Sequence, residues 1–261
     1  HGYAANEHLL DKFGDRVPVR ANEWDNRHFW RVSNAEQLQM SEDCGVVNLS
    51  HFHICDIEGP DHVALMEWLC VARVGGDATV GKGVYTHFLD DEGMVRADFT
   101  VLRLADRCRM VNGADAGPRD LHYMRRVAQD KGFDVTITDV TEKYVTIGIW
   151  GPNTRAKLQS VVAEPEALAH EAFPFAALRA IRIADRPVTA FRISYVGEQG
   201  FELHMAYEDG LAVWDALRST GATPVGVETY ANSRRVEKSL RLQNADLLTH
   251  YNLLEADLAR P

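Results

Sequence analysis

Apolar and polar residues alternate in several short stretches of the chain, and this pattern predicts β-strands. Val145, Ile147 and Ile149 would share one face of an extended strand. Residues 84–89 and 95–104 carry similar patterns on either side of an Asp-Asp-Glu-Gly turn, which is typical of a hairpin. Further strands are expected over 46–57, 109–112, 181–183 and 188–193.

Apolar residues three or four positions apart predict helices between these strands. Pro118 is suited to the first turn of a helix that would extend to about Lys131. Asp61 is expected to cap another helix, over 61–74, with its carboxylate. Further helices are expected over 35–44, 153–162, 211–217 and 231–242.

Strands and helices follow one another without regular β-α-β alternation, which predicts an α+β fold with antiparallel or mixed sheets and flanking helices. Residues 1–34 are polar and aromatic and are expected to form an N-terminal covering segment. The main region would be 35–258, made of two intertwined subdomains of about 35–165 and 166–258.

The net charge of −10 disfavours nucleic acid as a partner, because phosphate binding needs clustered Lys and Arg. No apolar run approaches the roughly 18 residues of a membrane helix, so no membrane association is expected. Four cysteines without a Cys-x-x-Cys pair are expected to be reduced core thiols, which fits a cytoplasmic location. His51 and His53 would share a strand face, but no third ligand is marked and no metal site is predicted.

Residues 195–202, Tyr-Val-Gly-Glu-Gln-Gly-Phe-Glu, place two glycines three apart beyond an apolar strand pattern. Glycine in a strand marks a bulge or a close approach by a ligand, so this stretch is either a plain turn or part of a binding site. A carboxylate such as Glu202 can accept hydrogen bonds from two adjacent N–H donors, which the edge of a pterin ring presents. Tyr195 and Glu202 would lie on opposite faces of an uninterrupted strand, so a bend at one glycine is needed to bring them to one side.

Six motifs occur in order along the chain: Gly-Val-Val-Asn-Leu-Ser-His at 45–51, Gly-Pro-Asp at 59–61, Tyr-Thr with a later Leu and Gly over 85–93, Asp98, Gly-Pro at 151–152, and the 195–202 stretch. Together they resemble the aminomethyltransferase family, which includes the T-protein of the glycine cleavage system. Four further stretches resemble more closely the folate-binding domain of dimethylglycine and sarcosine dehydrogenases and oxidases: 23–25, 173–175, 192–195 and 251–256.

The resemblance implies tetrahydrofolate as the cofactor and Asp98 as the catalytic carboxylate. It also implies folate contacts for a further set of residues: Tyr85, Asn112, Tyr195, Glu202 and Arg235. In this family a flavin domain can precede the folate domain, so FAD is implied only in an upstream domain or a partner. A last barrel-like domain is expected to follow, and residues 259–261 would begin that missing part.

Two departures from the family pattern are visible. Asn48 replaces the usual Asp, and the 231–237 stretch replaces an Ala-Arg-Asp triplet, which leaves the role of Arg235 open. Arg234, Lys238 and Arg241 would share one helix face, which could meet the carboxylates of a folate tail or could simply be solvated.

The function expected from the resemblance is tetrahydrofolate-dependent one-carbon transfer. The chain would capture the carbon released by N-demethylation of a small methylated amine and form 5,10-methylene-tetrahydrofolate. A fused or partner oxidoreductase domain would carry out the oxidation. Two alternatives stay open: transfer of a methyl group from an O-, S- or N-methyl donor to tetrahydrofolate, and a non-catalytic folate-binding regulatory or assembly module.

Overall fold

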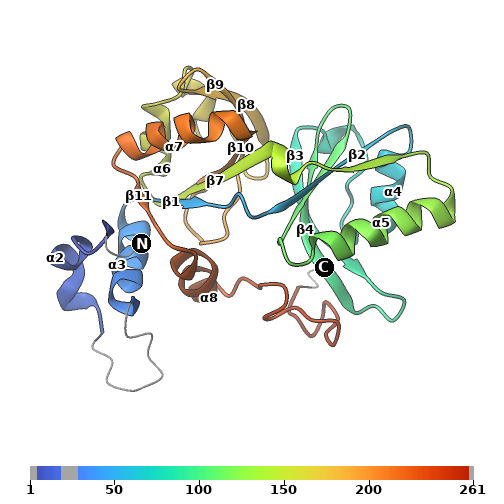
Figure 1. The fold of residues 1–261 in the computed structure, drawn as a ribbon, viewed down its shortest axis with the longest axis horizontal. Coiled ribbons are helices and arrows are strands. Elements are labelled where there is room, and N and C mark those ends of the chain that lie inside the picture. The colour runs from blue at the N-terminus through green and yellow to red at the C-terminus, as the bar shows by residue number, and fades with distance from the viewer. Residues whose placement is uncertain (1–4, 19–28, 259–261) are drawn as a thin grey trace. The chain divides into compact units, whose positions relative to one another are not determined.

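The computed structural model describes residues 5–18 and 29–258, and the chain divides into two compact units (Figure 1). Unit 1 is built from His1–Leu49, Thr146–Phe175 and Ala180–Leu240, and unit 2 from Ser50–Val145, Ala176–Arg179 and Arg241–Pro261. Both units are therefore assembled from separate stretches of the chain. This division differs from the split into 35–165 and 166–258 expected from the sequence.

Unit 2 contains a five-stranded sheet in the order β3-β4-β5-β2-β6 (Figure 1). Each neighbouring pair in it is antiparallel. The strands are β2 His53–Glu58, β3 Lys82–Leu89, β4 Val95–Arg103, β5 Cys108–Asn112 and β6 Thr136–Asp139. The helices of this unit are α4 His62–Leu69 and α5 Gly117–Lys131, with 3-10 turns η2 Asp77–Thr79 and η3 Thr141–Lys143.

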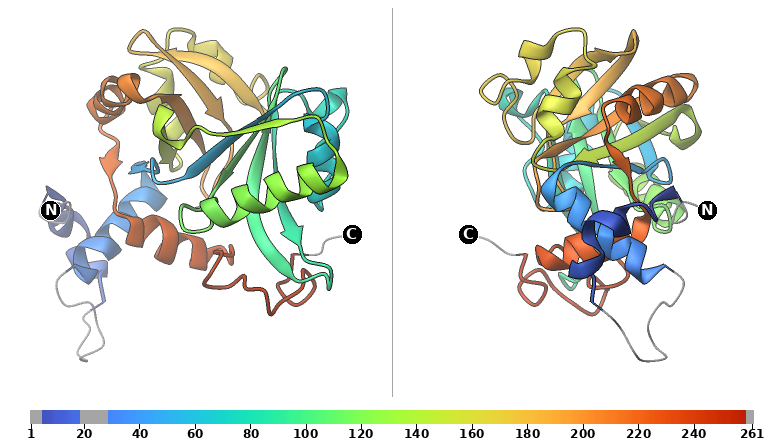
Figure 2. Two further views of the ribbon diagram at one scale, coloured as in Figure 1. Left: turned by 45° about the vertical axis from the view of Figure 1, so that its right-hand side comes forward. Right: turned by 90° about the vertical axis from the view of Figure 1, so that its left-hand side faces the viewer.

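One face of the unit 2 sheet forms its hydrophobic core under α4 and α5, and Figure 2 shows α5 lying along this sheet. Leu65 and Met66 from α4 and Met124 from α5 are fully buried there. Because side chains alternate along a strand, every second residue of β3 and β4 points to this core. The sheet residues that supply it are Cys55, Ile57, Phe88, Ala97, Phe99, Val101, Cys108, Met110 and Ile137.

Unit 1 contains most of a six-stranded sheet in the order β11-β1-β7-β10-β9-β8. β1 pairs antiparallel with β7 and parallel with β11, and β9 pairs antiparallel with β10, so the sheet is mixed. The strands are β1 Gly45–Asn48, β7 Tyr144–Trp150, β8 Leu178–Ile183, β9 Arg186–Phe191, β10 Gly200–Ala206 and β11 Thr223–Pro224.

The helices of unit 1 are short, apart from two. The longer ones are α3 Trp30–Glu42 and α7 Gly210–Ser219, which buries Val213 and Leu217. The remaining elements are α2 Leu9–Phe13, α6 Thr154–Gln159, the π-helix η6 Glu228–Arg234, α8 Arg235–Glu237, and the 3-10 turns η1 Gly14–Arg16, η4 Pro165–Leu168 and η5 Tyr207–Asp209.

The expected α+β class with antiparallel and mixed sheets is confirmed. Two expected elements have clearly different bounds. The strand region 46–57 is two strands in two different sheets, because the chain leaves β1 at Asn48 and enters β2 at His53. The helix expected over 231–242 ends at Glu237, and Ser239 takes a left-handed φ of 58° that a helix does not allow.

Asp61 does not cap α4 with its side chain, which is a correction to the sequence-based expectation. Its Oδ2 instead accepts a hydrogen bond from the backbone N–H of Asp134 at 2.8 Å, beyond the end of α5. The carboxylate therefore links the start of α4 to the segment between α5 and β6.

All four cysteines are free thiols, and burial raises the pKa of each one, that of Cys44 to about 11. Within residues 5–18 and 29–258, no helix combines the length and the apolar character that a membrane span requires. The Glu-Trp-Asp motif at 23–25 lies outside the described residues.

Candidate functional site

The β3–β4 hairpin of unit 2 brings Tyr85 and Asp98 together. Tyr85 pairs with Thr100 across the hairpin, and Asp98 lies two residues before Thr100 on the same face. Diagonal neighbours of this kind lie within reach of an aromatic side chain. The Tyr85 hydroxyl donates a hydrogen bond to Asp98 Oδ2 at 2.9 Å.

Asp98 is half-buried, on the face of the sheet opposite the hydrophobic core. Burial raises the pKa of its carboxyl to about 6, although the hydrogen bond from Tyr85 acts in the opposite direction. Its backbone N–H donates to Gln243 Oε1 at 3.2 Å, which ties β4 to the C-terminal segment of the same unit. A carboxyl group with this pKa can exchange a proton near neutral pH.

Asn112 lies on the other face of the unit 2 sheet. It pairs with Phe99, the neighbour of Asp98 along β4, so its side chain points to the helix-covered face. Its amide donates to Asp120 Oδ2 at 3.0 Å, and its Oδ1 is 3.1 Å from His53 Nδ1. Its side chain therefore belongs to a buried hydrogen-bond network, and a folate contact from Asn112 stays a prediction.

In unit 1, the chain bends between β9 and β10, over residues 192–199. Gly197 has a φ of 79°, which an L-residue adopts only with strain. Gly200 begins β10 so close to β7 that an added Cβ would lie 2.1 Å from the carbonyl oxygen of Ile149. The expected turn is confirmed, and both glycines have a physical reason.

Tyr195 lies in this bend beside other aromatic rings. Its ring centroid is 5.3 Å from that of Tyr230, which stacks in turn on Trp150 at 5.3 Å with an interplanar angle of 20°. The Trp150 indole N–H donates to the carbonyl of Ile193 at 2.8 Å. Three aromatic rings in contact, from Trp150 in β7 through Tyr230 in η6 to Tyr195, thus extend to the bend.

Glu202 is a buried carboxylate in β10, with 9% of the residue exposed. Its Oε2 lies 3.6 Å from Nε2 of His204, the next residue on the same strand face. His204 is also buried, and its Nδ1 is 3.1 Å from the hydroxyl of Thr146. The pair can accept and donate hydrogen bonds within one small region of unit 1.

The two arginines at the η6–α8 junction are both buried and make internal contacts. Arg234 donates to Glu198 Oε1 at 2.8 Å and to Glu237 Oε2 at 2.7 Å, so it fixes the bend. Arg235 donates to the carbonyls of Ala231 at 2.6 Å and Leu240 at 3.1 Å. Arg234 is therefore buried and is not part of a solvated basic face. Folate binding by Arg235 stays a prediction.

Sequence reasoning missed two residues that shape these regions, His87 and Tyr230, and it missed the burial of Arg234. His87 could have been found from its position two residues after Tyr85 in a strand pattern. The burial of Tyr230 and Arg234 depends on how η6 packs against the bend, and no local pattern marks it.

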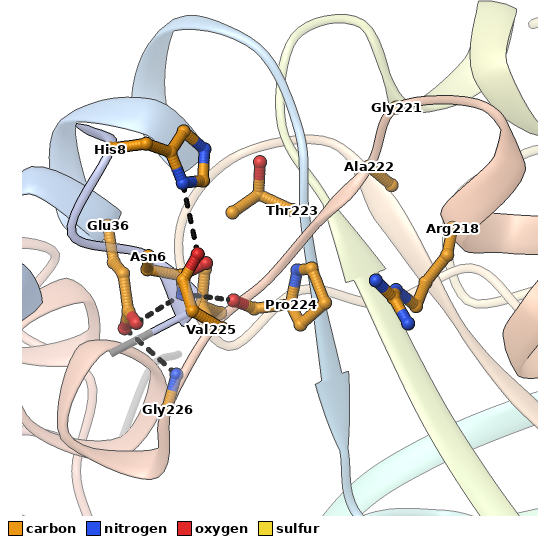
Figure 3. A pocket seen from close by; sticks show the side chains of 11 residues that line it. Asn6, His8, Glu36, Arg218, Gly221, Ala222, Thr223, Pro224, Val225 and Gly226 are labelled. Carbon is orange, nitrogen blue, oxygen red and sulfur yellow. Dashed lines mark hydrogen bonds between the residues drawn. The ribbon is translucent and has the colours of Figure 1, made fainter. Parts of the chain in front are cut away.

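A separate hollow in unit 1 lies beside β11 and contains none of the predicted site residues (Figure 3). Glu36 is buried there, and its oxygens accept from the Asn6 amide at 2.6 Å and from the Gly226 N–H at 2.9 Å. In the described part of the chain, no group of three or more His, Cys, Asp or Glu residues could hold a metal ion.

Comparison with known proteins identifies the class. The family model described as the GCVT N-terminal domain matches residues 11–261. The chain therefore belongs to this aminomethyltransferase-like family.

Individual relatives agree with this assignment. The chain is 32% identical over 236 residues to mitochondrial dimethylglycine dehydrogenase of Rattus norvegicus, covering 88% of this chain and 27% of the relative. It is 29% identical over 260 residues to an aminomethyltransferase of Paraburkholderia phymatum, covering 98% of this chain and 66% of the relative. The chain thus spans about a quarter of the dehydrogenase and under two thirds of the aminomethyltransferase.

Solved structures share the fold. The aminomethyltransferase T of the glycine cleavage system from Bartonella henselae matches with a TM-score of 0.75 and 20% identity, over 96% of this chain and 67% of that one. A chain of the heterotetrameric sarcosine oxidase from Corynebacterium sp. U-96 matches with a TM-score of 0.51 and 16% identity, over 76% of this chain and 96% of that one.

Proposed function

We propose that this chain is a tetrahydrofolate-dependent one-carbon transferase. It would capture the carbon released by N-demethylation of a small methylated amine and form 5,10-methylene-tetrahydrofolate. The observation that carries the proposal is the Asp98 carboxyl, which has a pKa of about 6 and is held by the Tyr85 hydroxyl. Membership of the family and the similarity to dimethylglycine dehydrogenase support it.

The side chains present suit a reduced pterin. The edge of a pterin carries N–H donors, and a buried carboxylate such as Glu202 is a strong acceptor for them. The ring of Tyr195, which packs beside the buried ring of Tyr230, offers an aromatic surface in unit 1. Bound tetrahydrofolate would supply the nucleophilic nitrogens that take up the one-carbon unit.

Asp98 would act as a proton acceptor and as a negative charge beside a developing cation. With a pKa of about 6 the carboxyl is mostly ionised at neutral pH, yet it binds a proton readily. The Tyr85 hydroxyl donates to Oδ2, which holds the orientation of the carboxylate. We assign the oxidation that releases the carbon to a flavin-containing domain or partner outside these residues.

The test is transfer to tetrahydrofolate by wild type, Asp98→Asn and a matched control, Asp91→Asn, an exposed carboxylate in the same hairpin. Asp98→Asn should lower the rate of methylene-tetrahydrofolate formation by about 10²–10⁴-fold, the usual contribution of general acid–base catalysis. The control should be unchanged.

Folate binding is measured separately by calorimetry with tetrahydrofolate. Asp98→Asn should still bind. Turnover that survives the Asn substitution would contradict the assignment, and methyl-folate as the product would favour direct methyl transfer. Binding without any turnover by wild type would favour a regulatory or assembly module.

A further inference from the structure

His87 belongs to the same face of the β3–β4 hairpin as Tyr85 and Asp98. It follows Tyr85 by two residues, so the two side chains point to one side of the sheet. It pairs directly with Asp98 across the hairpin, an arrangement that places the two Cβ atoms about 4.5–5.5 Å apart. The three residues therefore form one cross-strand group in which each neighbours the other two.

The rings of His87 and Tyr85 are in contact. Their centroids lie 5.0 Å apart with an interplanar angle of 78°, an edge-to-face arrangement. His87 is only 7% exposed, whereas Tyr85 is 45% exposed. The imidazole is thus the more deeply buried ring of the pair.

We propose that His87 is a positioning residue whose ring holds the Tyr85 phenol in the orientation that hydrogen-bonds Asp98. The inference deepens the proposed function and rests on it for its kinetic consequence. The geometry of the Tyr85–Asp98 pair, by contrast, can be measured without any folate chemistry.

The imidazole acts through packing and not through charge. Burial lowers the pKa of His87 to about 4, so the ring is neutral when Asp98 titrates. Its Nε2 is buried and finds no hydrogen-bond partner within the part of the chain that the structure describes. An unpartnered buried nitrogen destabilises the fold, so a phenyl ring in the same place should be tolerated.

Other groups also act on Asp98, and substitution of His87 leaves them unchanged. Asp115, in the turn before α5, and Asp120, in the first turn of α5, raise the pKa of Asp98 by their negative charge. Gln243 accepts from its backbone N–H. His87 and Tyr85 are the groups that face it from β3.

The experiment compares His87→Phe, which keeps a ring, with His87→Leu, which keeps similar bulk without one. Carbon-13 NMR titration of the Asp98 carboxyl in the full, folate-free chain gives its pKa directly. In His87→Leu the pKa should rise by roughly one unit, because the Tyr85 hydrogen bond to the charged form is weakened. In His87→Phe it should stay within about 0.3 unit of wild type, with a higher midpoint in urea denaturation.

Kinetics supply the second readout. The acid limb of the transfer rate against pH should move upward in His87→Leu by the same amount and return to the wild-type position in His87→Phe. His87→Gln serves as a second variant without a ring if the Leu variant does not fold.

Two results would overturn the inference. One is an unchanged Asp98 pKa in both variants without a ring. The other is a His87→Phe variant that loses as much as His87→Leu, which would show that the nitrogen matters and not the ring. If wild type shows no transfer to folate, the proposed function fails while the titration still decides the role of His87.

Discussion

The hairpin that carries Asp98 and the bend that carries Tyr195 are held in place by different interactions. In the hairpin, the Tyr85 hydroxyl lies 2.9 Å from Asp98 Oδ2, and the two residues come from adjacent strands of one antiparallel pair. In the bend, the backbone is fixed from outside by an arginine of η6 and by a close approach to β7. The first arrangement is local, and the second depends on parts of the chain distant in sequence.

This difference separates two kinds of role. A short hairpin with a half-buried acid suits proton transfer, which needs a defined hydrogen bond and a shifted pKa. A bend pinned against a buried carboxylate and aromatic rings suits binding, which needs a preorganised surface. Substitutions in the two regions should therefore affect different measurable quantities.

The largest effect is expected from Glu202→Gln, which removes the buried negative charge. Loss of a hydrogen bond to a charged group weakens binding by about 1.5–3 kcal/mol, so the dissociation constant for tetrahydrofolate should rise roughly 10–150-fold. Isothermal titration calorimetry measures it, with exposed Glu208→Gln as the control. An unchanged affinity would remove Glu202 from the binding surface.

The second effect concerns stability and the hairpin. Burial raises the pKa of Asp98 in the folded chain to about 6, above its ordinary value of 3.8. The folded chain therefore binds this proton more tightly than the unfolded chain does. The contribution of Asp98 to the free energy of unfolding is therefore fully present below about pH 4 and is lost as the pH rises through about 6.

Asp98→Asn should remove that loss and stabilise the chain at pH 7 by at most roughly 3 kcal/mol, since one pKa unit corresponds to about 1.4 kcal/mol. Solvent screening of this half-buried group would reduce the gain. Urea denaturation at pH 4 and pH 7 tests the sign: a variant less stable than wild type at pH 7 would contradict the buried-carboxyl description.

The third effect tests the bend through Gly200→Ala. The added methyl would meet the backbone of Ile149 and Trp150, which cannot move as a side chain can. Overpacking of this kind destabilises by about 1–3 kcal/mol. Gly14→Ala is the control, because Gly14 has a helical φ of −54° and nothing lies within 4 Å of an added Cβ. Equal urea midpoints for the two variants would refute the close approach.

The smallest effect is expected from Tyr85→Phe. Its hydroxyl stabilises the ionised form of Asp98, so the substitution should raise the pKa of Asp98 by about one unit. The transfer rate should then fall more at pH 6 than at pH 8, where the carboxylate is restored. Exposed Tyr207→Phe should show no such change, and an equal loss at both pH values would assign another role to the phenol.

The sequence predicted the hairpin well because its signals are local. Alternation and the Asp-Asp-Glu-Gly turn predict β3 and β4. They do not mark the register shift between Phe88 and Leu89, beyond which His87 pairs with Asp98. The bend was also predictable, because two glycines three apart interrupt a strand pattern. The face on which Asn112 lies was not predictable, since it depends on the pairing of β5 with β4.

The arginines show a second limit of sequence reasoning. Helical spacing suggested that Arg234 and Lys238 share a solvated or ligand-binding face, yet Arg234 is 1% exposed and paired with Glu198. A π-helix shifts the position of η6 side chains, and no residue pattern signals that turn. The assignment of Asp98, Glu202 and the other four residues to a folate site came from family resemblance and stays a prediction.

The interleaved construction of the units has a consequence for synthesis on the ribosome. The core of unit 2 lies almost wholly within one continuous stretch, Ser50–Val145, and can collapse soon after that stretch emerges. The sheet of unit 1 pairs Gly45 with Thr223, so its edge cannot close until most of the chain exists. Contacts this distant in sequence form slowly. A nascent chain should therefore carry a folded core of unit 2 while strand β1 still lacks its partner β11, which makes β1 a segment exposed to chaperones.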